Sequence, residues 1–270
     1  MRTIVFNQKG GVGKSSITVN LAAVSAQLGL KTLVIDLDVQ GNSSHYLGYD
    51  IQQKSDKTIA DLFDQTASWF SFSTPIKDFP HKTAHDNLDL IPSSPRLATM
   101  ENDLERRYKI YKLRDALNEL QPNYDCIFID SPPNLNFYSK AGLIAAQKLL
   151  IPFDCDSFSQ QALMTLLDNL AELRDDHNRD LELEGVVVNM FNAQARFPQQ
   201  IIESVKSLGL PVLEPYLPQS VKMKESHFEQ KPMIFSHPKH KLTQRFSELF
   251  GKLEMSKQVK KMTVSSDNLD

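Results

Sequence analysis

The segment NQKGGVGKSS, from Asn7 to Ser16, lies between a short apolar run and a stretch with helical periodicity. The common phosphate-binding loop has the pattern G-x-x-x-x-G-K-[ST], in which the first glycine stands five residues before the second. In this chain Gln8 occupies the first glycine position, and an additional lysine, Lys9, precedes the glycine pair. The segment therefore predicts a phosphate-binding loop of altered design, with one glycine fewer and one cation more.

The residue types of this loop suit contact with phosphate. Glycines let successive backbone N–H groups converge on phosphate oxygens, and a helix that starts at Lys14 directs its positive N-terminal end to the same place. We expect Lys14 to reach the β- and γ-phosphates and the Ser15 hydroxyl to bind Mg²⁺. The residues predicted to contact nucleotide here are Lys9, Gly10, Gly11, Val12, Gly13, Lys14, Ser15 and Ser16. The alternative, a glycine-rich turn with incidental lysines, is disfavoured by the strand–loop–helix context.

Beyond the loop, short apolar runs alternate with stretches of helical periodicity. The expected strands are Thr3–Phe6, Thr32–Ile35, Leu88–Ile91, Cys126–Ile129, Leu149–Pro152, Gly185–Asn189 and Pro211–Leu213. The expected helices are Lys14–Leu28, Ile59–Phe63, Lys109–Leu120, Tyr138–Ala146, Ser159–Asp176, Pro198–Leu208 and Pro238–Glu254. This alternation predicts an α/β fold with a mostly parallel, twisted sheet that helices cover on both faces. We expect one domain over residues 1–254 and a disordered tail over residues 255–270, which lack apolar periodicity.

Two acidic residues follow the second expected strand, in the segment DLDVQGN. Ligands of open parallel sheets bind beyond the carboxyl ends of the strands, so residues at these ends are candidates for the site. Asp36 and Asp38 are two residues apart, and in an extended chain they point the same way. They could hold a magnesium-bound water or orient an attacking one. The alternative is a turn built on aspartate and Gly-Asn, which these residues also suit.

Polar residues also end two later strands. Asp130 closes the apolar strand of YDCIFIDSPP, which is the arrangement of an acid that holds Mg²⁺ through water. The alternative role, a cap on the next helix, is disfavoured because two prolines follow almost at once. Asn189 ends the strand of GVVVN, where its amide could donate to and accept from the edge of a purine. A plain turn-forming asparagine is the alternative there.

The composition favours a soluble cytoplasmic protein. The chain has 270 residues, of which 41% are hydrophobic and 23% charged, as in an ordinary α/β domain. Its two cysteines, Cys126 and Cys155, make neither a disulfide framework nor a C-x-x-C motif, so we expect no iron–sulfur site and a reducing compartment. We find no signal peptide and no apolar run close to the roughly 20 residues that span a bilayer.

The charges are unevenly distributed along the chain. The net charge is −3, but the stretch from Arg196 to Lys261 carries +6 and the remainder −9. A basic C-terminal third is compatible with a surface that binds nucleic acid. The alternative is a set of solvated lysines on surface helices, which charge alone does not exclude.

Four segments together, KGGVGKSS, DLDVQGN, YDCIFIDSPP and LPQSVKMKES, resemble the ParA/MinD family of ATPases with a deviant phosphate loop. The resemblance runs from residue 2 to about residue 253, and it is nearest to the small ParA-type proteins that partition DNA or position cargo. It extends to TIADLF at 58–63, LIPSSPRLATMENDL at 90–104 and LIPFDCDSFSQQAL at 150–163. With the loop starting at residue 8, we expect no N-terminal DNA-binding extension of the kind that larger relatives carry.

The resemblance implies a P-loop NTPase with three layers, αβα, that binds ATP and Mg²⁺ and hydrolyses ATP slowly. It also implies a homodimer that forms on ATP, with Lys9 reaching across to the partner's phosphates. Lys14 would keep the phosphate role given above, Asp38 would position the attacking water, and Asp130 would complete the Mg²⁺ shell with Ser15 and Asp38. Asn189 and the backbone around Pro218 would frame the adenine.

The resemblance further implies a basic surface that binds DNA without sequence preference. Lys222 matches one DNA-contacting position of the family, and Lys224 is a second cation nearby. Another such position, usually arginine, is Gln194 here, and Arg196 lies two residues on. The chain also has Val39 where proline is usual and Ser15 where threonine is usual, although serine keeps the hydroxyl. An activating partner, ParB-like or a cargo adaptor, and a nucleoid-associated location are expected from the same resemblance.

Three other functions stay open on the sequence. A MinD-like switch at a membrane surface needs a basic amphipathic C-terminal helix, but the tail after Met255 has few apolar residues and an acidic end. A metabolic ligase of the dethiobiotin synthetase kind would spend ATP on a bound metabolite. A scaffold that binds ATP without hydrolysing it is disfavoured by Asp38 and Asp130.

Overall fold

A computed structural model describes residues 1–52, 57–65, 74–156 and 159–254, and the expected tail at 255–270 lies outside them. Eight strands form one sheet in the order β3-β4-β2-β5-β1-β6-β7-β8. The strands are β1 (Arg2–Val5), β2 (Thr32–Asp36), β3 (His81–Lys82), β4 (Leu88–Ile91), β5 (Cys126–Asp130), β6 (Lys148–Phe153), β7 (Glu182–Val188) and β8 (Val212–Leu213). All neighbouring strands are parallel except β3 and β4, which are antiparallel. The predicted α/β fold with a mostly parallel sheet is confirmed.

Eleven α-helices connect these strands among the described residues. They are α1 (Lys14–Gln27), α2 (Asn42–Tyr46), α3 (Ile59–Asp64), α4 (Leu97–Arg106), α5 (Lys112–Leu120), α6 (Phe137–Ala145), α7 (Ser159–His177), α8 (Arg196–Ser207), α9 (Val221–Phe228), α10 (Met233–Ser236) and α11 (Lys241–Lys252). Short 3₁₀ turns lie at Ile76–Asp78, Lys109–Tyr111 and Gln121–Asn123.

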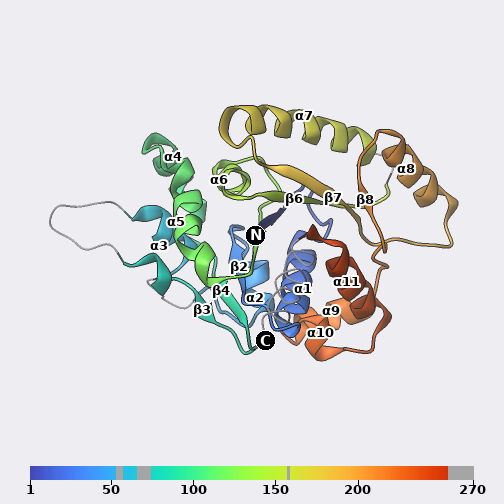
Figure 1. The fold of residues 1–270 in the computed structure, drawn as a ribbon, viewed down its shortest axis with the longest axis horizontal. Helices are drawn as coiled ribbons and strands as arrows, with labels where there is room; N and C mark the ends of the chain where they lie inside the picture. The colour runs from blue at the N-terminus through green and yellow to red at the C-terminus, as the bar shows by residue number, and fades with distance from the viewer. Residues whose placement is uncertain (53–56, 66–73, 157–158, 255–270) are drawn as a thin grey trace, which may run out of the picture.

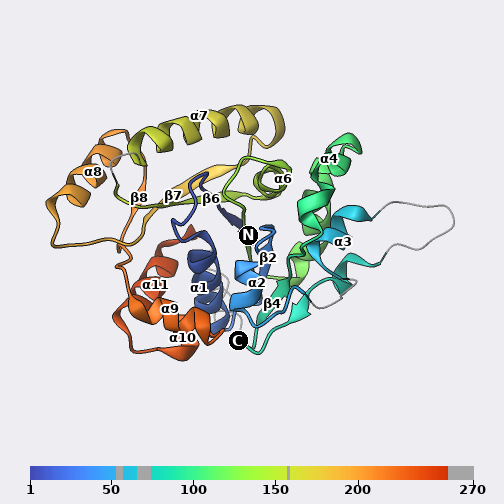
Figure 2. The same ribbon diagram turned by 180° about the vertical axis from the view of Figure 1, so that it is seen from behind.

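The helices form two layers on opposite faces of the sheet. One apolar core joins the sheet to α3 through α8, and the other joins it to α1, α2, α10 and α11. Figures 1 and 2 show α7 on one side of the sheet and α1 and α11 on the other. Strands β2, β4 and β5 are buried along their whole length, which explains why they read as continuous apolar runs. The three-layer arrangement is therefore confirmed.

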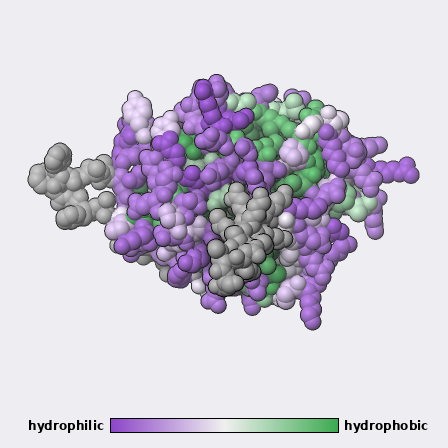
Figure 3. All heavy atoms as spheres, in the orientation of Figure 1, coloured by the Kyte–Doolittle hydropathy of each residue, from purple (hydrophilic) through white to green (hydrophobic). Residues whose placement is uncertain are grey.

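The surface in the view of Figure 1 is largely hydrophilic. Figure 3 shows one larger hydrophobic area on this face, in the upper part, over the region where Figure 1 draws β6, β7 and α7. The residues that the sequence predicts to bind nucleotide follow the carboxyl ends of the strands. Because β1, β2, β5 and β7 are parallel, these ends meet at one edge of the sheet.

Several elements differ from those that the sequence predicts. The helices α2, α4, α9 and α10 and the strand β3 were not expected. Helix α4 turns Leu97, Met100 and Leu104 to the core at the i, i+3, i+7 spacing of an amphipathic helix, whereas α9 buries only the polar Ser226 and shows no such spacing. Helix α2 begins directly after Gly41, whose positive φ of 65° also suits the turn that the sequence predicts there.

Candidate nucleotide-binding site

The loop after β1 has the geometry of an anion-binding turn. Gly13 stands at the N-terminus of α1 with φ of 91°, in the left-handed region that only glycine adopts at little cost. A Cβ atom at Gly13 would come within 2.3 Å of Asn189 Nδ2, so the close approach of the two strand ends also requires glycine. The loop therefore presents backbone N–H groups and the start of α1 to one place.

The Lys14 side chain curls back over this loop. Its Nζ donates to the carbonyl of Lys9 at 3.0 Å, and the side chain is largely buried. Burial lowers the pKa of Lys14, while the charges of Asp130 and Asp38 act against that shift. An ammonium held among these acids at a helix N-terminus is placed to meet phosphate oxygens.

An open pocket of about 480 Å³ lies beside the loop. It collects side chains from the loop, from the segment after β2, and from α9. Its lining residues are Gly10, Gly11, Gly13, Lys14, Ser15, Ser16, Asp38, Gln40, Asn42, His45, Tyr46, Pro133, Met190 and His227. The structure thus brings six of the eight predicted loop residues and Asp38 together around one cavity, whereas Lys9 and the buried Val12 do not line it.

The two aspartates after β2 have different surroundings. Asp36 is fully buried, and its carboxylate accepts hydrogen bonds from the Ser44 N–H at 2.8 Å and the Ser44 hydroxyl at 2.7 Å. Asp38 lines the pocket, and its Oδ1 accepts from the Gln40 N–H at 3.0 Å. The expectation that both acids face one ligand is therefore wrong for Asp36, because Ser44 holds it inside the protein.

Asp130 lies next to Asp36 in the register of β5 and β2. Its carboxylate accepts hydrogen bonds from the Ser43 hydroxyl at 2.7 Å and the Ser131 N–H at 3.0 Å. Burial raises the pKa of Asp130 to about 6, although hydrogen bonds from Ser15 and Ser43 lower it. Burial and the charge of Asp130 raise the pKa of Asp36 to about 8. Two acids that lie this close and this deep favour a proton or a cation between them.

The oxygens near the loop fit a magnesium ion. Ser15 and Asp38 line the pocket with hydroxyl and carboxylate oxygens, which are the ligands that Mg²⁺ prefers. Asp130 is buried and does not line the pocket, but it is hydrogen-bonded to Ser15 and would support the ion from behind. Among the described residues there is no group of three or more His, Cys, Asp or Glu side chains that could hold a metal ion by themselves. A cation at this place would therefore complete its shell with phosphate oxygens and water, as Mg²⁺ commonly does with nucleotides.

The raised pKa of Asp130 predicts a pH-dependent stability difference for Asp130→Asn. Because the pKa of the folded state exceeds the ordinary 3.8, the wild-type protein loses stability as the pH rises from about 4 through about 6. The variant carries no charge there, so its unfolding free energy should gain about 1–3 kcal/mol on the wild type over this range. Urea unfolding without nucleotide or Mg²⁺ measures this difference, with the exposed Asp50→Asn as control. If the difference in unfolding free energy between variant and wild type is the same at pH 4 and pH 7, then the pKa of Asp130 is not raised by folding.

Lys9 is bound within its own chain. Its Nζ donates to Oδ1 and Oδ2 of Asp154, both at 2.8 Å, and also bonds Asp156. Burial lowers the pKa of Lys9, but the hydrogen bonds to the two acids outweigh this and raise it. The described state of Lys9 is therefore an intrachain ion pair, and its predicted reach to a partner's phosphates stays a prediction.

The residues predicted to frame the base lie beside a second, smaller pocket. Asn189 Nδ2 donates to the Val12 carbonyl at 2.9 Å, which fixes its amide against the phosphate loop. Asn189 and Pro218 both line this cavity of about 200 Å³. The other lining residues are Gly13, Ser16, Met190, Gln219, Ser220, Met223, Lys224, His227, Leu242 and Phe246. Its apolar walls and its position next to the loop suit a flat base more than a charged group.

The three residues predicted to contact DNA differ in their exposure and in their ion pairs. Lys222 is ion-paired with Glu225 at 2.5 Å on α9. Lys224 is exposed and lines the smaller pocket, whereas Arg196 is exposed at the start of α8 and lines neither of the two pockets above. The structure brings Lys222 and Lys224 together on one short helix, and Arg196 lies on a separate element.

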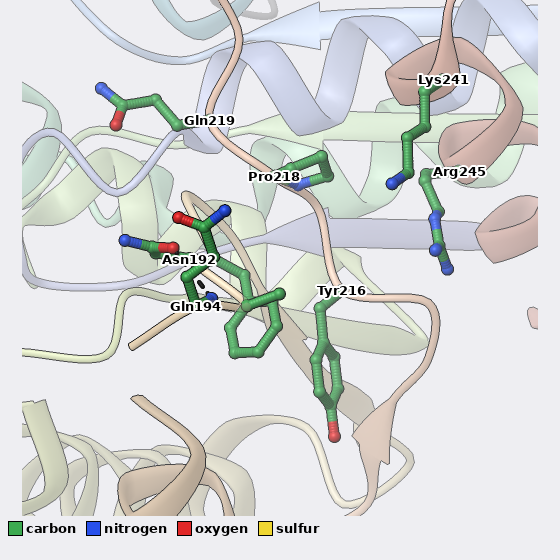
Figure 4. Close-up of a pocket in the computed structure, with 9 residues that line it drawn as sticks. Asn192, Gln194, Tyr216, Pro218, Gln219, Lys241 and Arg245 are labelled. Atoms are coloured by element: carbon green, nitrogen blue, oxygen red, sulfur yellow. Dashed lines mark hydrogen bonds between the residues drawn. The ribbon is translucent and has the colours of Figure 1, made fainter. Parts of the chain in front are cut away.

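A third pocket, of about 480 Å³, adjoins the base pocket through Pro218 and Gln219. Figure 4 shows Asn192, Gln194 and Tyr216 around it, with Lys241 and Arg245 extending from α11. Gln194 thus shares a pocket with Lys241 and Arg245, two cations of a helix that comes much later in the chain. The sequence analysis did not identify Lys241 and Arg245, and the only sequence signal for them was the basic character of the C-terminal third.

No helix among the described residues is long and apolar enough to cross a bilayer.

Comparison with known proteins places these features in a family. A family model described as an AAA domain matches residues 1–183. The chain is 33% identical over 239 residues to the chromosome partitioning protein ParA of Myxococcus xanthus, which covers 88% of this chain and 82% of the relative.

Two solved structures share the fold. The apo form of Cyanothece McdA superposes with a TM-score of 0.81 at 22% identity, over 93% of this chain and 98% of that one. Cobyrinic acid a,c-diamide synthase from Mycobacterium smegmatis, with bound ADP and magnesium, superposes with a TM-score of 0.76 at 24% identity, over 92% of this chain and 91% of that one. McdA and a diamide synthase thus share this fold although their names indicate different functions. The relative with 33% sequence identity is a chromosome partitioning protein. The chain belongs to the ParA/MinD family of P-loop ATPases.

Proposed function

We propose that this protein is a partitioning or positioning ATPase that forms a homodimer on ATP, binds DNA without sequence preference and is reset by slow hydrolysis. The observation that carries the proposal is the phosphate loop with Lys9 in front of Gly10 and Gly11, placed beside the acids Asp38 and Asp130. A relative of 33% identity is a chromosome partitioning protein, which supports a partitioning or positioning function. An activating partner, ParB-like or a cargo adaptor, and an association with the nucleoid form part of the proposal.

The residues around the pocket beside the phosphate loop would each have a role in ATP binding. The backbone N–H groups from Gly10 to Gly13 and the Lys14 ammonium would hold the phosphates, and the adenine would lie in the smaller pocket against Asn189 and Pro218. Mg²⁺ would be held by Ser15 with Asp38 and Asp130 and would neutralise phosphate charge. These are the ligands, ATP and Mg²⁺, that the relatives' structures with bound nucleotide also support.

Hydrolysis would depend on positioning, because phosphoryl transfer to water needs little covalent help from the protein. Asp38 lines the phosphate pocket, and burial raises its pKa, which makes its carboxylate a better proton acceptor. We assign to it the orientation of the attacking water. A rate far below the ~1–100 s⁻¹ of kinases suits a switch whose hydrolysis times the release of DNA.

The proposed DNA surface lies at the end of the sheet near α9 and α11. Lys224 borders the base pocket, and Lys241 and Arg245 border the adjoining pocket that Gln194 also lines. Pro218 and Gln219 belong to both pockets and so connect the two groups of cations. Lys222, though ion-paired with Glu225, and Arg196 add further positive charge to the same part of the chain. Such cations bind the DNA backbone by neutralising phosphates, independently of sequence.

This surface predicts a loss of DNA binding for the double variant Lys241→Gln/Arg245→Gln. Removing two phosphate contacts should lower the slope of log K against log salt by about 2 and weaken binding by about 10–100-fold near 0.1 M salt. A salt series with a mobility-shift assay measures both. Lys252→Gln, an exposed lysine at the far end of α11, is the matched control and should leave the slope within error. An unchanged slope in the double variant would remove α11 from the DNA surface.

The proposal as a whole is tested by DNA binding of the wild-type protein with ATP, with ADP and without nucleotide. We expect binding that requires ATP and weakens steeply with salt. Binding that is the same in all three conditions would contradict the switch. Binding of liposomes with ATP, in the absence of DNA binding, would replace the proposal by a MinD-like membrane function.

A further inference from the structure

One histidine of α9 contacts the phosphate loop directly. His227 Nε2 lies 3.1 Å from Ser16 Oγ, and Ser16 is the residue that follows Lys14 and Ser15 at the start of α1. His227 is also one of the few residues that line both the phosphate pocket and the base pocket. It therefore stands at the junction where a nucleotide's phosphates and its base would meet.

The His227 ring is fixed in place by its neighbours. It lies against the Tyr46 ring, with 4.1 Å between the ring centroids and an angle of 54° between the planes. The Tyr46 hydroxyl in turn bonds the Ser226 hydroxyl at 2.5 Å and accepts from Asn20 Nδ2 at 3.1 Å. A buried polar network thus joins α1, α2 and α9, and it is satisfied by hydrogen bonds at each of these steps.

The opposite end of α9 carries two lysines, of which Lys224 is exposed and Lys222 is ion-paired with Glu225. Lys222 and Lys224 lie in its first turn, whereas Ser226 and His227 lie in its last. The helix has eight residues, and only Ser226 among them is buried. Besides the apolar contact of Met223 with the core, α9 is held by the polar contacts of Ser226 and His227, and the His227 contact ends on the phosphate loop itself.

We propose that His227 is a positioning residue of the nucleotide site, which holds the Ser16 hydroxyl through Nε2 and makes the order of α9 depend on nucleotide binding. The inference rests on the proposed nucleotide binding and adds to it a specific link between the phosphate loop and the helix that carries Lys222 and Lys224. Ser16 is the contact on the loop, and Tyr46 supports the ring from behind. In this account the nucleotide need not touch the lysines to influence them.

A double-mutant cycle on nucleotide affinity tests the contact. In the full chain, we expect Ser16→Ala and His227→Ala each to weaken the binding of fluorescent ADP by about fivefold, the worth of one hydrogen bond. The double variant should be no more than about tenfold weaker than the wild type, because both changes remove the same bond. His227→Gln, whose Nε2 can reach a similar position, should restore affinity to within about twofold of the wild type.

Amide hydrogen exchange distinguishes a link to the nucleotide from a purely structural role of His227, because a purely structural role would not make the exchange depend on ADP. ADP should slow exchange over residues 221–228 in the wild type and in His227→Gln, and this slowing should vanish in His227→Ala. Phe228→Ala, at the neighbouring position of the same helix with a side chain 90% exposed, is the control and should keep the slowing.

The outcomes separate this inference from the function on which it rests. Additive losses in the cycle, or full ADP-dependent slowing in His227→Ala, would overturn the role of His227 while nucleotide binding stands. Absence of ADP binding by the wild type would overturn both. Wild-type ADP binding without any DNA binding would overturn the proposed DNA function and leave the role of His227 intact.

Discussion

Asp38→Ala is expected to lower the steady-state rate of ATP hydrolysis by about 100–10,000-fold, the range for loss of a group that positions or accepts a proton. Asp38 lines the phosphate pocket, and its side chain is largely buried beside Lys14. ATP binding should persist, because the glycines, Lys14 and Ser15 hold the phosphates independently of the water. The variant should therefore accumulate in its ATP-bound, dimeric, DNA-binding form.

Phosphate release from ATP measures this prediction, with Asp50→Ala as control because Asp50 is exposed and lies outside the pockets described above. The control should hydrolyse ATP like the wild type. Rapid turnover by Asp38→Ala would show that another group orients the water. Loss of ATP binding together with activity would instead assign Asp38 to the hold on Mg²⁺ alone.

Lys9→Ala is expected to weaken ATP-dependent dimerisation by at least about 30-fold. A cross-subunit ammonium–phosphate contact is a buried, charge-assisted interaction, and losing one partner of such a contact costs about 2–5 kcal/mol. Binding of ATP to one subunit should change little, since Lys9 bonds Asp154 and Asp156 in the described state and not the phosphate pocket of its own chain. The variant thus separates ATP binding from association.

Sedimentation of Lys9→Ala over a range of protein concentrations, with ATP and with ADP, gives the dissociation constant. Lys31→Ala is a suitable control, because this exposed lysine follows α1 at the opposite end of the helix from the loop. If Lys9→Ala dimerises on ATP as strongly as the control, then its pairing with Asp154 and Asp156 is its whole role.

The fold and the strand–loop–helix frame of the phosphate loop were predictable because their signals are local. The loop from Lys9 to Ser16 needs only its own glycines, its lysine and the strand and helix on either side. Asp38, Asp130 and Asn189 could be added because parallel strands bring their carboxyl ends to one edge. The sequence could not show that Asp36 turns inward, because that depends on the serine of α2 that binds it.

The contacts that the sequence could not reveal join residues far apart in the chain. Lys9 meets Asp154 across 145 positions, and Ser16 meets His227 across 211. Neither pair shows a spacing that a periodicity or a motif would pick out. Helix α9 escaped prediction because Met223 is its one residue that packs against the apolar core, which is too little to make a helical apolar pattern.

ATP, and not ADP, is expected to make a dimer of this chain, and light scattering of the Asp38→Ala protein measures this. The chain has a mass of 30.6 kDa. We expect a molar mass of twice this value with ATP and Mg²⁺, and the mass of one chain with ADP and Mg²⁺. The same mass under both conditions, whether of one chain or of two, would contradict it.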